Sequence, residues 1–178
     1  QELERWMIEF LQANGDMVDI VSFHRYPFPS SQLAGPPSAD ELRHASAEWD
    51  ALVPYARALV REHTGRDLPI AVTEANSSWA ASSGGDTTMD SHLNAIWWGD
   101  ALGRMIRKGV YMVNQFAIIG DFGLMGNYEV KPIYNVYLMY KEFGQERLYA
   151  SSGEELGSVF ASVREDGSLA VMVVNLAA

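Results

Sequence analysis

The sequence of 178 residues contains no cysteine, which excludes disulfide bonds and thiolate metal sites. No apolar run reaches the roughly 18 residues that a membrane-spanning helix needs. Cations are also scarce, because 13 Lys and Arg oppose 23 Asp and Glu and leave a formal net charge of −10. Nucleic acids and anionic membranes require a basic surface, so neither is expected as a partner. A neutral ligand is compatible with this charge, and both a secreted and a cytoplasmic location remain open.

Signatures of metal and cofactor binding are missing as well. The four histidines lack the spacing of metal ligands. None of the predicted strands is followed by a Gly-rich nucleotide turn or a phosphate loop. We therefore expect no metal site and no cofactor. The chain begins with Gln1 instead of Met and enters an apolar helix pattern at once, which indicates a start inside a longer protein.

The most informative stretch of the sequence is segment 68–79, Leu-Pro-Ile-Ala-Val-Thr-Glu-Ala-Asn-Ser-Ser-Trp. Its apolar run, residues 70–72, is too short for a helix and predicts a strand buried on both faces. Glu74 lies where this strand leaves the core. An unpaired carboxylate in a dry site is costly, so Glu74 is solvated, paired or used in chemistry.

The order of the remaining patterns predicts an α/β fold. Apolar spacing and capping residues indicate helices at 3–14, 38–65, 88–107 and 132–144. Buried-type strands are predicted at 17–23, 70–74 and 110–119. Strands that alternate with such helices form a parallel sheet. Short strands at 148–150, 158–164 and 169–175 predict an appended antiparallel unit.

Two parallel architectures fit this order, an open doubly wound sheet and a (β/α)8 barrel. Catalytic residues of barrels gather at the C-terminal ends of the strands. Each predicted strand ends in polar residues, namely His24 and Tyr26, Glu74 and Asn76, and Asn114 and Gln115. A convergent site at the C-terminal ends of the strands is therefore expected.

Three segments resemble the clan A retaining glycoside hydrolases, which include arabinofuranosidases, β-xylosidases and many endoglucanases. Segment 22–26, Ser-Phe-His-Arg-Tyr, resembles the His-x-Tyr element of their sixth strand, and segment 72–76 resembles their seventh strand with its nucleophilic Glu. Segment 123–134 is similar to the stretch before their last barrel helix. The resemblance covers nearly the whole chain. It implies that residues 1–144 are strands six to eight of a (β/α)8 barrel and that residues 145–178 are part of a small C-terminal β-sandwich.

The resemblance also implies a chemistry. Retaining hydrolysis of O-glycosidic bonds needs two carboxylates about 5 Å apart. Glu74 would be the nucleophile, Tyr26 its hydrogen-bond donor, and His24 a second donor or a sugar contact. The family's acid/base Glu follows an Asn at the end of strand four, and no Asn-Glu pair occurs in this chain. The isolated chain is therefore expected to be inactive, and its expected partner is a missing N-terminal half or a second copy.

The expected ligand is a neutral oligo- or polysaccharide. Predicted substrate contacts are Phe28, Asn76, Trp79, Asn114 and Gln115. For Phe28 and Trp79, sugar stacking and ordinary loop packing remain alternatives. Many family members carry Trp at the end of strand eight, where this chain has Asn114-Gln115-Phe116. The main alternative function is a non-catalytic carbohydrate-binding or interaction fragment, and a different (β/α)8 hydrolase or lyase is a third.

Some side-chain orientations can also be predicted. Ile20, Ser22, Ile70 and Val72 are expected to face the barrel interior. Asp100 is expected on a solvated helix face. The adjacent Trp97 and Trp98 diverge by about 100° around a helix, so they are not both expected in the core.

Overall fold

The computed structural model describes residues 2–28, 35–80 and 83–177. Three parallel strands form the central sheet in the order β1-β2-β3, with β1 at Val21–Arg25, β2 at Ile70–Ala75 and β3 at Met112–Gln115. The helical elements are α1 (Glu2–Asn14), α3 (Ala39–Ala45), η1 (Ser46–Glu48), α4 (Trp49–Thr64), α5 (His92–Arg107) and α6 (Pro132–Lys141). None of the described helices is long and apolar enough to cross a membrane.

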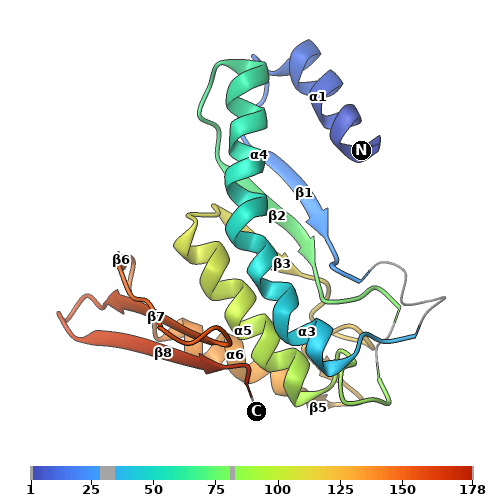
Figure 1. The fold of residues 1–178 in the computed structure, drawn as a ribbon, viewed down its shortest axis with the longest axis vertical. Coiled ribbons are helices and arrows are strands. Elements are labelled where there is room, and N and C mark those ends of the chain that lie inside the picture. The colour runs from blue at the N-terminus through green and yellow to red at the C-terminus, as the bar shows by residue number, and fades with distance from the viewer. Residues whose placement is uncertain (1, 29–34, 81–82, 178) are drawn as a thin grey trace.

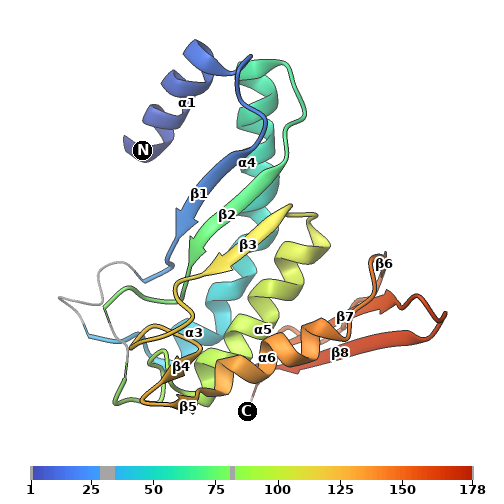
Figure 2. The same cartoon turned by 180° about the vertical axis from the view of Figure 1, so that it is seen from behind.

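The described helices cover one face of the parallel sheet and leave the other face bare. In Figure 1 α4 and α5 lie in front of the strands, and Figure 2 views the strands from the face that no described helix covers. On the covered face, Ile70 packs in a cluster with Val60, and Val72 packs in a cluster with Trp98. The expectation that Ile70 and Val72 face a barrel interior is therefore wrong. They are paired with Val21 and Phe23, whose side chains also turn toward the helices.

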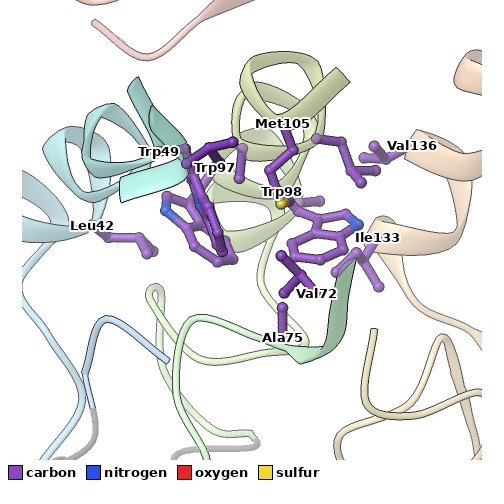
Figure 3. Packing of buried hydrophobic residues seen from close by; sticks show 13 residues of the cluster. Leu42, Trp49, Val72, Ala75, Trp97, Trp98, Met105, Ile133 and Val136 are labelled. Carbon is purple, nitrogen blue, oxygen red and sulfur yellow. The ribbon is translucent and has the colours of Figure 1, made fainter. Parts of the chain in front are cut away.

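The largest core cluster joins the sheet to α4, α5 and α6. Trp97 and Trp98 are both buried, at 1% and 0% exposure, so the expectation that they do not both lie in the core is wrong, although Trp98 does pack against Tyr137 of the neighbouring helix α6. Figure 3 shows Trp97 beside Trp49 and Trp98 toward Ile133. The two rings diverge as helical geometry requires, and the core extends around α5 far enough to receive both.

The helix predicted over 38–65 is divided in the structure. Its start is confirmed, because Ser38 and Glu41 form a reciprocal capping box. Its end is also confirmed, because Gly65 adopts the left-handed conformation with φ 68°. Between these ends, the 3-10 turn η1 separates α3 from α4. The apolar spacing continues through this turn, which is why the sequence pattern does not reveal it.

After the parallel sheet the chain forms two antiparallel units. A short hairpin pairs β4 (Met125–Gly126) with β5 (Glu129–Val130). A second sheet has the order β6-β7-β8, with β6 at Glu146–Leu148, β7 at Gly157–Val163 and β8 at Leu169–Asn175. Its inner face packs Phe160, Met172 and Val174 against α6 residues such as Tyr140. On its outer face β8 exposes Leu169, Val171 and Val173 at 61%, 59% and 72%.

A buried charge network connects these layers. Asp100 of α5 is 0% exposed, so the expectation of a solvated position is wrong. Its Oδ2 accepts hydrogen bonds from Ser46 Oγ at 2.6 Å and Arg104 Nε at 2.7 Å. Arg104 also contacts Asp50 of α4 and Ser158 of β7. At Oδ2 a guanidinium and a hydroxyl replace the water that the carboxylate loses on burial, which offsets part of the cost.

Candidate active site

A bulge in β2 aims Glu74 at the uncovered face of the sheet. Phe23 of β1 is paired with Val72, but the next residue, His24, is paired with Glu74, so Thr73 is an extra residue without a Cα partner in β1. Strict alternation from Val72 would have turned Glu74 toward the helices. The extra residue changes the phase, and Glu74 lies with His24 on the open face.

Tyr26 and His24 surround the carboxylate of Glu74. The Tyr26 hydroxyl donates a hydrogen bond to Glu74 Oε1, and this confirms the predicted contact between the ends of β1 and β2. His24 Nδ1 lies 3.7 Å from Glu74 Oε2, which makes an ion pair only when the imidazole is protonated. In the described part of the chain, the side chain of Glu74 thus has a hydrogen bond from Tyr26 and a possible ion pair with His24.

Burial first, and then the hydrogen bond to Glu74 and its negative charge, raise the pKa of Tyr26 well above its ordinary value. The phenol therefore stays protonated and can donate through the neutral and mildly alkaline range. The ring of Trp79 packs against Tyr26 with centroids 5.7 Å apart and planes tilted by 54°. Trp79 is 49% exposed, so part of its ring remains available beside the carboxylate.

Of the two residues predicted at the end of β3, only Asn114 lies on the open face with Glu74. Gln115 is paired with the buried Ala75, so its side chain turns toward the covered face, where Nε2 lies 3.4 Å from the Phe122 carbonyl. The structure therefore does not bring Gln115 to Glu74. Asn114, one residue earlier, has the opposite orientation and is exposed on the face that carries Glu74.

The side chains of two other predicted substrate contacts, Asn76 and Phe28, bind or pack against other parts of the protein. Asn76 is 0% exposed, and its Nδ2 donates to the Phe116 carbonyl. The expectation that Asn76 touches substrate is wrong, because its amide joins the ends of β2 and β3 inside the protein. Phe28 packs against the main core cluster, and its backbone N–H donates to the Ser77 carbonyl at 3.1 Å. Loop packing thus accounts for Phe28.

Sequence patterns did not reveal the residues that support the site. Arg25 binds Glu48 on the covered face of the sheet. Ser77 Oγ donates to Asn94 Oδ1 of α5 at 2.5 Å, which ties the loop after β2 to the helix. Both pairs join residues more than 15 positions apart, so local periodicity carries no signal for them. No group of three or more potential metal ligands occurs among the described residues.

Proteins of similar sequence and similar fold include glycosidases. No family model matches the sequence. A curated β-xylosidase of Geobacillus stearothermophilus is 24% identical over 204 residues, which cover 97% of this chain and 36% of that protein. The α-L-arabinofuranosidase of Thermotoga maritima in its arabinose complex superposes with a TM-score of 0.74 at 19% identity, over 97% of this chain and 41% of that one.

A glycoside hydrolase family 39 β-xylosidase of Caulobacter crescentus gives a TM-score of 0.61 at 20% identity, with 92% of this chain and 35% of that chain covered. The chain has the fold of part of a clan A glycoside hydrolase. The predicted resemblance is thus confirmed. The chain spans between about a third and two-fifths of the length of these relatives.

Proposed function

We propose that this chain is the C-terminal part of a retaining glycoside hydrolase that cleaves O-glycosidic bonds of a neutral oligo- or polysaccharide. The observation that carries the proposal is the position of Glu74, which lies on the open face at the C-terminal ends of parallel strands with Tyr26 as its donor. Glycosidase relatives that align with almost the whole chain support it.

In this proposal β1, β2 and β3 are strands six to eight of a (β/α)8 barrel made by residues 1–144. Their order in the sheet and the helices on one face support this assignment. Residues 145–178 are part of a β-sandwich whose other sheet covers the outer face of β8. The exposed Leu169, Val171 and Val173 support that arrangement, because apolar residues on both faces of a sheet indicate burial on both.

In this proposal the chain supplies the nucleophile, and a segment outside it supplies the acid/base group. The ionised Glu74 attacks the anomeric carbon as the bond to the leaving oxygen breaks, and an acid from the other segment gives that oxygen its proton. The same group then takes a proton from water, which attacks the glycosyl carbon and releases Glu74. Tyr26 holds the carboxylate in orientation, His24 and Asn114 face the sugar, and Trp79 offers a stacking surface.

Turnover of aryl glycosides tests the proposal in the longer protein, or in the chain combined with the segment that completes the sheet. Glu74→Gln should abolish turnover, because the amide cannot attack as a carboxylate. The matched control is Glu62→Gln, on the exposed surface of α4, which should leave turnover unchanged. An active Glu74→Gln enzyme would refute the nucleophile assignment.

The isolated chain should show little or no turnover, because the proton donor lies outside it. Robust hydrolysis by the isolated chain that Glu74→Gln abolishes would place the acid within these residues. The first candidates would then be Asp121 and Glu129, which follow β3 and are exposed.

A non-catalytic carbohydrate-binding fragment is the second candidate, and the exposed part of the Trp79 ring beside Glu74 favours it. That function predicts oligosaccharide binding without turnover even in the completed protein. It also predicts that Glu74→Gln changes binding only weakly, whereas Trp79→Ala weakens it through loss of the exposed ring.

A further inference from the structure

Arg25 occupies a special place next to the candidate site. It is the last residue of β1 and directly precedes Tyr26. Because strand side chains alternate, Arg25 turns to the covered face while His24 and Tyr26 turn to the open face. There Arg25 Nε lies 3.1 and 3.2 Å from the two carboxylate oxygens of Glu48, and Nη2 lies 2.5 Å from Oε2.

The backbone turn that carries Glu48 is held in place by its neighbours. It is the last residue of η1, the 3-10 turn that divides the long helix. The residues beside it are fixed independently: Ser46 donates to the buried Asp100, and Trp49 is 0% exposed with its ring stacked on Phe23 of β1. A carboxylate on such a turn can fix the position of a guanidinium that binds it with two nitrogens.

Tyr26 needs such support because it lies just beyond the paired part of β1. The last residue of β1 that pairs with β2 is Arg25, opposite Ala75. Beyond Tyr26, the next backbone contact is the hydrogen bond from Phe28 N to the Ser77 carbonyl. Tyr26 is thus held between Arg25 on one side and Phe28 on the other. A displacement of Arg25 would move both His24 and Tyr26 relative to Glu74.

We propose that Arg25, bound by Glu48, is a positioning residue that sets Tyr26 and His24 against the carboxylate of Glu74. The inference rests on the proposed function only where it concerns catalysis, since the geometry can be tested without turnover. A guanidinium suits this role because its planar fork fixes direction as well as distance, which a lysine ammonium does not.

The test is made on the chain combined with the segment that completes the sheet, and it uses the nuclear Overhauser effect between the rings of Tyr26 and Trp79, whose centroids are 5.7 Å apart. The resonances are assigned with Tyr26→Phe and Trp79→Phe. Arg25→Met and Glu48→Gln should each lower this cross-peak several-fold, and Arg25→Lys should lower it less because one hydrogen bond can remain. The matched control is Arg61→Met, which breaks an ion pair of 3.2 Å between side chains that are 65% and 69% exposed. It should leave the cross-peak unchanged.

An unchanged cross-peak in folded Arg25→Met and Glu48→Gln would overturn the inference. If Arg25→Met does not fold, the isosteric Glu48→Gln decides the outcome, with amide spectra confirming its fold. In the completed enzyme both variants should lower kcat by a larger factor than they change KM, because Asn114 and Trp79 keep their contacts with the sugar. If Glu74→Gln leaves turnover intact while the cross-peak depends on Arg25, the proposed function fails and the positioning role stands.

Discussion

At the scale of single residues, the site depends on a hydroxyl that meets a carboxylate. Tyr26 donates to Glu74, and the tilted ring of Trp79 covers the phenol on another side. A hydrogen bond to a charged group contributes about 1.5–3 kcal/mol, more than a neutral one. The phenol can therefore keep the carboxylate of Glu74 in one orientation.

Tyr26→Phe removes this hydroxyl and keeps the ring. The lost hydrogen bond should lower kcat of the completed enzyme roughly 10- to 100-fold, since each 1.36 kcal/mol corresponds to about a factor of ten. Steady-state kinetics measure the change. Tyr111→Phe, at an exposed tyrosine outside the site, is the control and should have no effect. Equal rates for both variants would contradict the orienting role of Tyr26.

At the scale of elements, α5 is the part that holds the two sheets together. Its Asp100 and Arg104 reach η1, α4 and β7, and its Gly103 lies so close to Phe160 that an added Cβ would be 2.3 Å from the ring. Burial alone raises the pKa of Asp50, but Arg107 and Arg104 outweigh it and hold this pKa below its usual value. The joint between α4 and α5 thus stays charged at neutral pH.

Arg104→Met tests this joint. The substitution keeps much of the side-chain volume but leaves the buried Asp100 without its cation, so the free energy of unfolding should fall by about 3–5 kcal/mol. Urea unfolding measures this value. Asp67→Asn, which breaks the exposed pair with Arg61, should cost less than about 1 kcal/mol. Similar costs for the two variants would show that the buried network contributes no more than a surface pair.

At the scale of the whole molecule, apolar side chains are exposed next to both outer strands of the parallel sheet. Just before β1, Met17 and Ile20 are 71% and 42% exposed. Beyond β3, Ile118 and Ile119 are 67% and 74% exposed. A closed barrel leaves no strand edge, whereas the described sheet has two. These features support the proposal that the chain packs against further polypeptide.

The isolated chain should therefore be poorly stable or self-associated at micromolar concentration. Exposed apolar surface disfavours the monomer by roughly 25 cal/mol per Å², and association removes that surface from water. Sedimentation velocity and a thermal melt measure the two properties. Addition of the segment that completes the sheet should give a single species with a cooperative melt. A stable, cooperatively melting monomer of the chain alone would contradict the partial-barrel proposal.

The sequence by itself determined the local elements and the place of the site along the chain. The capping box of Ser38, the left-handed Gly65 and Pro132 at the start of α6 act within a few residues, so patterns reveal them. The same holds for β8, whose predicted and observed limits agree. Polar residues after apolar strands also located Glu74 and Tyr26.

Only the tertiary structure decided which way side chains turn and what they bind. The extra Thr73 sends Glu74 to the open face and leaves Val72 among the helices, because register is a property of paired strands. The burial of Asp100 and the fork between Arg25 and Glu48 likewise require residues far apart in the chain to meet. The period of apolar residues shows which side chains of a segment share a face. What each face packs against depends on contacts between residues far apart in the chain.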